Sequence, residues 1–410
     1  MKPVVVCFAV LCLLLSACQA GGTPFVVSTG EPSFAPTPAR SYCGDDRCEG
    51  PENPQNCPAD CKTQSAPTAT APARPTQPVP TATAPARSTQ PASATTAPTR
   101  LALPTPTATA RPSDGKKVLY LGIMVHLEGW PDDQNQARFN EHARLMRDYA
   151  TLFEKYGAKL TWESKEVTEG VIKWGDNVLL EMQRRGHGVG VHADIGGQKN
   201  YDCRRFAADL RTKKQQLESL GVTVRHVSGI VSHCDWVTAA ADAGYLFTTG
   251  QVAYSVMSMP IENRPAQFRD CQTPALCHDT FPTALADRLH PWRMNSGADW
   301  LTPAPKGRLV LIPFSGGLTH MEEDATGRTP GKSEDLTQAD IDYFIRELEQ
   351  AIALAQPGKV NTYYVSWSLG TPLNQKMLET WLQRIAPYVA SGQVEWKTLP
   401  EMYDAYVRGE

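Results

Sequence analysis

Strand-like and helix-like segments alternate along residues 116–410, and this alternation constrains the fold more than any other feature of the chain. Residues 118–126 form an unbroken apolar run, as expected for a strand that is buried on both faces. Residues 136–156 then carry apolar side chains at helical spacing and stop at Gly157. Because strands and helices in alternation build parallel sheets, the pattern predicts an α/β domain.

The alternation continues to the end of the chain. Further strands are predicted at 158–163, 187–192, 224–230, 245–249, 309–314, 361–367 and 394–399, and helices at 171–185, 204–220, 236–243, 338–356 and 373–390. Seven or eight such units fit one (β/α) barrel over 116–410, with an irregular insertion at 251–308. Insertions of this length are typically functional or braced by disulfides, and Cys271 and Cys277 predict a bridge here.

The N-terminal residues have the pattern of an export signal. Lys2 precedes an apolar run at 4–15, which is too short for a permanent transmembrane helix and fits a cleaved signal peptide. Leu-Ser-Ala-Cys at 15–18 resembles the lipobox of bacterial lipoproteins, which implies a signal peptide at 1–17 and a lipid on Cys18. An ordinary secretory signal is the alternative. We expect an exported protein, lipid-anchored on the extracytoplasmic face of the bacterial membrane.

Two further segments separate the signal from the barrel. Residues 43–61 hold four cysteines in C-x4-C-x8-C-x3-C spacing, which predicts a small disulfide-rich module, since so short a segment cannot bury a core. Its acidic side chains predict a calcium site, and a disulfide knot without an ion is the alternative. Residues 62–115 are rich in Thr, Ala and Pro and repeat PTATAPAR at 67–74 and 80–87, which predicts a disordered linker.

The charge of the chain limits its partners. A formal net charge of −3 is too small to indicate binding to nucleic acid or to an anionic membrane surface. We therefore expect no nucleic-acid partner, and contact with the membrane only through the lipid anchor.

Three predicted strand ends carry a histidine and a carboxylate two residues apart. The pairs are His126 with Glu128, His192 with Asp194, and His233 with Asp235. Strand side chains repeat with a period of two, so both members of a pair face the same side. At the mouth of a barrel such groups suit Zn²⁺ or a similar divalent ion. Asp235 has an alternative role as a helix N-cap, and His187, which follows the helix-ending Gly186, is predicted to be structural.

Two of these regions resemble motifs of the polysaccharide deacetylase (NodB-homology) family, and the resemblance covers most of 116–410. Residues 186–192 match a Gly-His-x-x-Gly-x-His run that delivers a metal-binding histidine, here His192. Residues 119–129 align with the first motif, and Glu128 lies at its metal-binding aspartate. The resemblance implies a metal-dependent carbohydrate hydrolase that acts on acetylated polysaccharide or peptidoglycan, and the lipobox-like residues 15–18 imply that it is anchored at the surface.

The chain departs from the family pattern at three positions. Leu127 lies where the family has its general base, and Gly196 lies where it has the second metal-binding histidine. Ser366, on a late strand, lies where the family commonly has a catalytic histidine. The usual deacetylase machinery is therefore incomplete.

Neighbouring side chains could compensate. We expect Asp194 or His233 to complete a metal site with Glu128 and His192, and Asp194 or His126 to act as the base. Two other functions stay open. One is a barrel without catalysis that serves as a carbohydrate-binding or cell-surface module. The other is a glycosidase that uses two carboxylates, for which the separation between Glu128 and Asp194 would be diagnostic.

Four more residues complete the predicted site. Trp130 and Arg293 are the predicted substrate-binding residues, with Trp130 at the mouth because it follows Glu128 closely in the sequence. Cys203 starts the helix after the third strand and Cys234 follows the fourth, so both fall on one rim of the barrel. In an exported protein this placement favours a Cys203–Cys234 disulfide over metal binding by Cys234.

Overall fold

The computed structural model describes residues 117–129, 131–271, 281–319, 335–370 and 372–409. The described residues belong to one compact unit. The signal peptide, Cys18, the module at 43–61 and the linker at 62–115 lie outside the described residues, as do Trp130 and Cys277. In the described part, no helix combines the length and the apolar character needed to cross a membrane.

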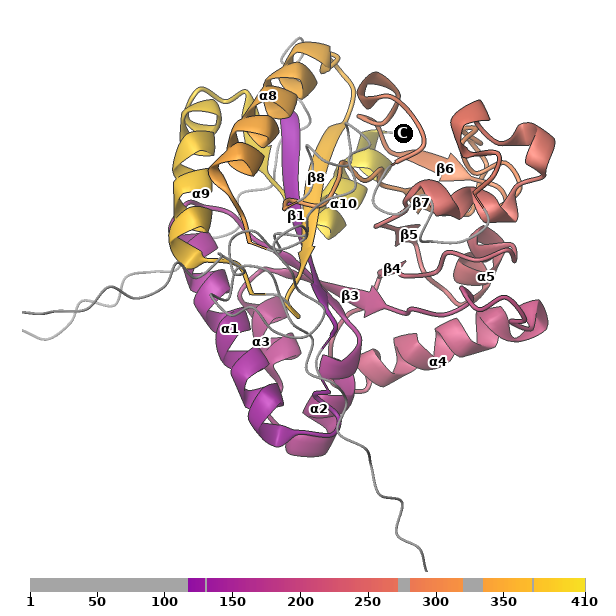
Figure 1. The fold of residues 1–410 in the computed structure, drawn as a ribbon, viewed down its shortest axis with the longest axis horizontal. Coiled ribbons are helices and arrows are strands. Elements are labelled where there is room, and N and C mark those ends of the chain that lie inside the picture. Colours follow the sequence, from indigo (N-terminus) through magenta and orange to yellow (C-terminus); the bar gives the residue numbers. More distant parts are fainter. Residues whose placement is uncertain (1–116, 130, 272–280, 320–334, 371, 410) are drawn as a thin grey trace, which may run out of the picture. The chain divides into compact units, whose positions relative to one another are not determined.

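A mainly parallel sheet with helices around it builds the domain (Figure 1). The strands are β1 (Leu119–Leu127), β2 (Thr161–Ser164), β3 (Gly188–His192), β4 (His226–Ser228), β5 (Phe247–Thr248), β6 (Trp292–Met294), β7 (Leu309–Leu311), β8 (Asn361–Ser368) and β9 (Val394–Trp396). The helices are α1 (Gln136–Glu154), α2 (Glu166–Trp174), α3 (Val178–Arg184), α4 (Phe206–Glu218), α5 (Trp236–Asp242), α8 (Gln338–Leu354), α9 (Gln375–Ala390) and α10 (Leu399–Gly409). Short 3-10 turns occupy much of the described insertion between β5 and β6.

The strands follow the order β6-β7-β5-β4-β3-β2-β1-β8, and β9 pairs with β1. Adjacent strands are parallel except β6 and β7, which are antiparallel. The segment after β7 also bonds to β8, because the Ser315 amide donates to the Tyr364 carbonyl (3.1 Å) and the Leu318 amide to the Ser366 carbonyl (2.7 Å). These bonds bring the sheet back onto itself. The predicted (β/α) barrel class is confirmed.

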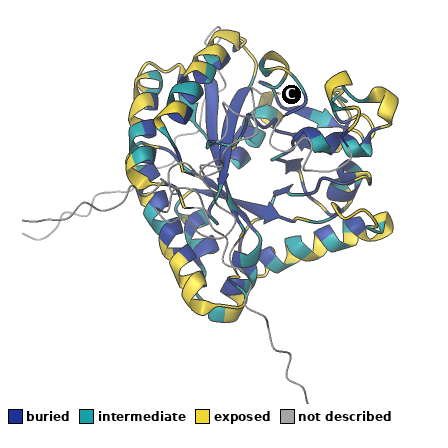
Figure 2. Cartoon of the chain, viewed as in Figure 1, coloured by how far each residue is buried: buried dark blue, intermediate teal, exposed yellow. Residues whose placement is uncertain are grey.

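Burial explains why these segments fold as they do. The strands are almost wholly buried, whereas the helices bury one face and expose the other (Figure 2). Helix α1 shows the pattern, since Phe139, Met146 and Phe153 are wholly buried and lie at helical spacing. The apolar face of each helix thus removes the outer surface of the sheet from water.

One predicted helix is two helices in the structure. The segment predicted at 171–185 is interrupted because α2 ends at Gly175, whose φ of +87° is left-handed and favours glycine. The Asn177 side chain then caps α3 by accepting from the Leu180 amide at 3.1 Å. Apolar residues keep their spacing across this break, so periodicity alone did not reveal it. Strand β6 and helix α10 were not predicted either.

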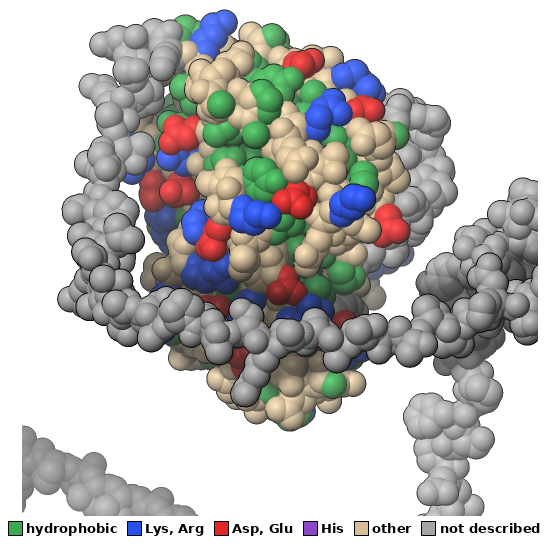
Figure 3. Space-filling view, turned by 90° about the vertical axis from the view of Figure 1, so that its left-hand side faces the viewer, with side chains coloured by type: hydrophobic (Ala, Val, Ile, Leu, Met, Phe, Trp, Pro, Cys, Tyr) green, Lys and Arg blue, Asp and Glu red, His purple; other side chains and the backbone are tan. Residues whose placement is uncertain are grey.

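Charges of both signs are interspersed on the face that carries α1 and α9 (Figure 3). Some of them pair between helices. Lys155 contacts Glu379 at 2.9 Å and joins α1 to α9, and Arg384 contacts Asp342 at 2.9 Å and joins α9 to α8. Exposed pairs of this kind contribute little to stability. This face therefore has mixed charge, in line with the small net charge of the chain.

Candidate metal centre

The ends of β1, β2 and β3 bring His126, Glu163 and His192 together. The Nδ1 atoms of the two histidines are 3.0 Å apart, and Glu163 Oε2 lies 3.8 Å from His126 Nδ1. Within the group, one potential ligand atom from each residue lies within 4.8 Å of the others. Strand register explains the first contact, because His126 and Glu163 are direct partners in the parallel pair β1–β2.

The strand β4, which pairs with β3, adds Ser228 to this region. Ser228 is the register partner of His192 in β3–β4, and its hydroxyl lies 2.8 Å from His192 Nδ1. Parallel strands end at the same edge of a sheet, so residues far apart in the chain converge here. The sequence prediction that His126 and His192 meet at the mouth of the barrel matches this placement.

Glu163 is an unusual residue for its surroundings, because its side chain is wholly buried. Burial acts to raise the pKa of Glu163, but contacts with His226 and His126 outweigh it and lower that pKa. Oε1 accepts a hydrogen bond from Thr249, whereas Oε2 is buried and receives none from the described residues. A buried carboxylate oxygen without a donor is costly, and a bound cation would satisfy it.

Glu128 contacts the other nitrogen of His192. Its Oε2 lies 3.0 Å from His192 Nε2, on the opposite side of the ring from His126. Burial acts to raise the pKa of Glu128, but the hydrogen bond and the charge of His192 lower it to about 2. The predicted metal ligand therefore touches His192, but it lies outside the His126–Glu163–His192 group.

Asp194 lies at the rim and not in the group. Its side chain is 61% exposed and pairs with Lys165, whose Nζ is 2.8 Å from Asp194 Oδ2 and 3.8 Å from Glu128 Oε2. The two carboxylates named for a glycosidase thus share one ammonium group. Asp194 also has a φ of 48°, in the left-handed region that aspartate adopts more readily than most residues.

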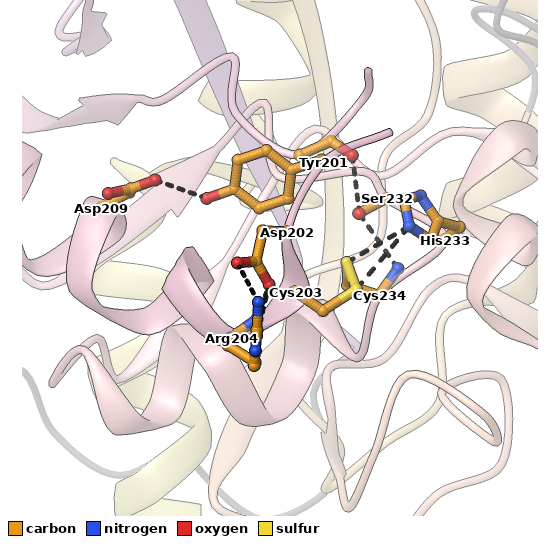
Figure 4. Close-up of a disulfide and its surroundings, with 9 residues drawn as sticks. Tyr201, Asp202, Cys203, Arg204, Asp209, Ser232, His233 and Cys234 are labelled. Atoms are coloured by element: carbon orange, nitrogen blue, oxygen red, sulfur yellow. Dashed lines mark hydrogen bonds and ion pairs between the residues drawn. A yellow bond between two sulfur atoms is a disulfide. The ribbon is translucent and has the colours of Figure 1, made fainter. Parts of the chain in front are cut away.

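His233 lies beside a disulfide (Figure 4). Cys203 and Cys234 are bridged, with their Cα atoms 5.5 Å apart, which confirms the predicted pairing. His233 Nε2 is 3.7 Å from each sulfur. The structure groups His233 with these cysteines and does not bring it to His126 and His192. While the bridge is intact, neither sulfur is a thiolate ligand.

The remaining predicted residues have local roles or lie outside the described part. Asp235 caps α5 by accepting from the Thr238 amide at 3.0 Å, which is the alternative that the sequence offered. Arg293 lies on β6 and donates to the Gly307 carbonyl within the same region (3.4 Å). Cys271 is buried and disulfide-bonded, and its predicted partner Cys277 lies outside the described residues.

An open hollow of about 550 Å³ borders the candidate centre. Glu128 lines it together with Lys165, Glu166 and Ser368, and the loop after β1 forms another part of its wall. Glu128 therefore faces the hollow and contacts His192 at the same time. A ligand in this hollow would contact Glu128, which in turn contacts His192.

Sequence reasoning missed Glu163, together with Ser228, His226 and Thr249 around it. The sequence pattern pairs a histidine with a carboxylate two residues apart on one strand, and Glu163 has no histidine at that spacing. One signal was available. Glu163 ends a predicted strand of otherwise buried character, and a carboxylate there needs a partner from another strand.

The fold and the site define a (β/α) barrel with a histidine–carboxylate group at the ends of its first three strands. No protein-family model matches the chain, and no curated protein matches its sequence. Among solved structures it is similar to one described as a polysaccharide deacetylase of Mycobacterium smegmatis (13% identity, 74% of this chain and 95% of that chain, TM-score 0.47). A second, described in the same way and from Pseudomonas aeruginosa PAO1, is 11% identical over 73% of this chain and 94% of that chain, with a TM-score of 0.48.

A third similar structure is Puue allantoinase, 12% identical over 73% of this chain and 94% of that chain, with a TM-score of 0.44. The deacetylases predicted from the sequence motifs are thus among the structures that this chain resembles. At such identities and TM-scores the likeness assigns no role to any residue of this chain. The function has to be inferred from the side chains of the site itself.

Proposed function

We propose that the barrel is a metal-dependent carbohydrate hydrolase in which His126, His192 and Glu163 hold a divalent ion such as Zn²⁺. The proposal rests on the convergence of these three side chains from separate strands, with the buried Glu163 Oε2 lacking a donor among the described residues. Two histidines and one carboxylate are a known donor set for catalytic zinc and leave a fourth position open. Two ring nitrogens on one tetrahedral zinc lie roughly 3.3 Å apart, close to the 3.0 Å between these Nδ1 atoms.

When bound, the ion would polarise a substrate carbonyl and lower the pKa of a water molecule. Glu128 accepts a hydrogen bond from Nε2–H of His192, so in the neutral ring Nδ1 is unprotonated and able to bind a cation. In this proposal Glu128 orients a ligand, and His126 is a ligand and not the base.

The base must come from a residue other than Leu127. Leu127 is wholly buried, and its side chain carries no titratable group. We propose Asp194, which follows His192 closely, is exposed at the rim and is held in place by Lys165. This carboxylate is exposed and pairs with Lys165, which lines the hollow.

The substrate class and the location follow from the sequence motifs. We propose acetylated polysaccharide or peptidoglycan as the substrate, because residues 186–192 resemble the metal-binding motif of polysaccharide deacetylases. The lipobox-like residues 15–18 support a lipid anchor on Cys18 and a location on the extracytoplasmic face of the membrane. No nucleic-acid partner is proposed, since the net charge is only −3.

Metal content tests the proposal directly. We expect the purified full chain to bind about one divalent ion per molecule, measured by elemental analysis, and to release acetate from acetylated chitooligosaccharides or peptidoglycan. The variants His126→Ala and His192→Ala remove ring nitrogens of the group, so both are expected to lose the ion and the activity.

His233→Ala is the matched control, because the structure places this histidine beside the disulfide, and its metal content is expected to equal that of the wild type. Metal content that His192→Ala leaves unchanged would contradict the proposal. Stoichiometric metal without acetate release would favour the non-catalytic binding module, which the buried Leu127 at the position of the base also favours. Metal-free cleavage of glycosidic bonds that Glu128→Gln and Asp194→Asn each abolish would instead show the two-carboxylate glycosidase.

A further inference from the structure

We infer that Thr249 and His226 are positioning residues that hold the Glu163 carboxylate so that its second oxygen faces the two histidines. This inference rests on the proposed metal centre and concerns how the protein prepares one ligand of it. Glu163 lies on β2, His226 on β4 and Thr249 immediately after β5. Three different strands therefore meet at one carboxylate.

The contacts on Glu163 are divided between its two oxygens. Thr249 Oγ1 donates a hydrogen bond to Oε1, and His226 Nε2 lies 3.4 Å from the same oxygen. All three side chains are wholly buried. Oε2 receives no hydrogen bond from the described residues and lies 3.8 Å from His126 Nδ1. The carboxylate is thus anchored at one oxygen, and the other is directed toward the histidine group.

The His226 ring is itself fixed by packing on both faces. On one side it stacks on Phe247, with the ring centroids 4.7 Å apart and the planes 17° from parallel. On the other side it fills the space above Gly190, where a Cβ atom would lie 2.2 Å from His226 Nε2. No side chain fits at position 190 while the ring stays in place. Strand register sets the first contact, because Phe247 pairs with His226. Gly190 precedes Val191, which pairs with Val227 beside His226.

This packing explains why residue 190 is a glycine, which the sequence alone did not explain. Gly190 belongs to the run at 186–192 that ends in His192, and its missing side chain makes room for His226. The same stretch of chain therefore provides one histidine of the group and the space behind its carboxylate.

A carboxylate held in one orientation binds a cation more tightly than one that must be reoriented on binding. Residues that hydrogen-bond a ligand typically contribute 10- to 100-fold in metal affinity. Removing the Thr249 hydroxyl would remove the hydrogen bond that Oε1 receives from Thr249, so the carboxylate would be held less firmly in one direction. We therefore expect the loss to appear in the affinity for the metal and not only in activity.

The test is a zinc titration of the full chain after its metal has been removed with a chelator. We expect Thr249→Val to raise the zinc dissociation constant about 10- to 100-fold, whereas Thr249→Ser keeps the hydroxyl and stays close to the wild type. His226→Phe keeps an aromatic ring between Phe247 and Gly190 but removes the nitrogen, and it should also weaken zinc binding.

Thr248→Val is the matched control. Thr248 is the preceding residue and is equally buried, but its hydroxyl donates to the Val227 carbonyl at 2.8 Å and not to Glu163. Zinc affinity of this variant should equal that of the wild type, and thermal unfolding of each metal-free variant shows whether it is folded.

Each outcome has a distinct meaning. Weak binding by a folded Thr249→Val, restored in Thr249→Ser, supports the inference. Wild-type affinity in folded Thr249→Val and His226→Phe overturns it and leaves the proposed function standing. Failure of the wild type to bind zinc overturns both. If Thr249→Val does not fold, His226→Phe decides in its place.

Discussion

At the scale of single residues, His187 shows how burial and hydrogen bonds set the charge of a histidine. Its side chain is wholly buried, Nδ1 accepts from the Leu160 amide at 3.0 Å, and Nε2 lies 3.2 Å from Glu154. A proton on Nδ1 would face the Leu160 N–H, so the ring is held neutral. Burial lowers the pKa of His187 to about 4, against the opposing effect of Glu154 and with help from Lys159. The structural role predicted for His187 agrees with these contacts.

The low pKa of His187 predicts loss of stability in mild acid. In the unfolded chain His187 is protonated below about pH 6.5, whereas in the folded protein it is protonated only below about pH 4. The free energy of unfolding should therefore fall by about 2 kcal/mol between pH 7 and pH 5, a window in which Glu154 stays ionised. Urea unfolding at the two pH values measures the change.

His187→Gln is the comparison, because an amide can accept from Leu160 and donate to Glu154 without titrating. Its unfolding free energy should fall less between pH 7 and pH 5 than that of the wild type, and the difference between the two proteins should be about 2 kcal/mol. Parallel pH dependences of the two proteins would show that His187 does not cause the effect.

At the scale of elements, the loops after β3 and β4 are joined by the Cys203–Cys234 disulfide. The loop after β3 carries Asp194, and the loop after β4 carries Gly229. Gly229 lies so close to the end of β3 that a Cβ there would be 2.8 Å from the Asp194 amide. The bridge therefore holds together two loops that surround the candidate centre.

Removing this disulfide should destabilise the domain without changing the charge of the centre. The two cysteines are 31 residues apart, and closing a loop of that length contributes roughly 3–4 kcal/mol in the chain-entropy model. The double variant Cys203→Ala/Cys234→Ala is preferable to a reductant, because Cys271 is also disulfide-bonded. We expect a lower urea midpoint for this variant, and a midpoint equal to that of the wild type would contradict the prediction.

At the scale of the whole molecule, the candidate ligands connect three neighbouring strands of the barrel. His126 comes from β1, Glu163 from β2 and His192 from β3. A ligand that binds only the folded chain stabilises all of it, by RT ln(1 + [L]/Kd). Binding at one rim should therefore be visible in the unfolding of the entire domain.

Zinc is expected to raise the melting temperature of the full chain. At a free concentration about 100 times the dissociation constant, the gain is roughly 2.7 kcal/mol, or a rise of about 4 °C for a domain of this size. Differential scanning fluorimetry with and without a chelator measures the shift. His192→Ala should melt at the same temperature in both conditions, and an equal zinc shift in this variant would mean that the ion binds elsewhere.

Much of this protein was determined by the sequence alone. Apolar runs and helical spacing specify strands and helices locally, and their alternation predicted the barrel. His126 and His192 were identified because they lie at strand ends, and parallel strands end at one edge. Cys203 and Cys234 were paired by the same reasoning.

The tertiary structure alone decided which side chains meet. Glu163 joins the histidines because the register of β1 and β2 pairs it with His126, and register depends on contacts between strands that no local pattern contains. Glu128 contacts Nε2 of His192, and His233 lies at the disulfide, although both belong to the histidine–carboxylate pairs found in the sequence. Spacing along the chain shows which side chains share one face of a strand. Which side chains from different strands come into contact depends on the register between the strands of the barrel.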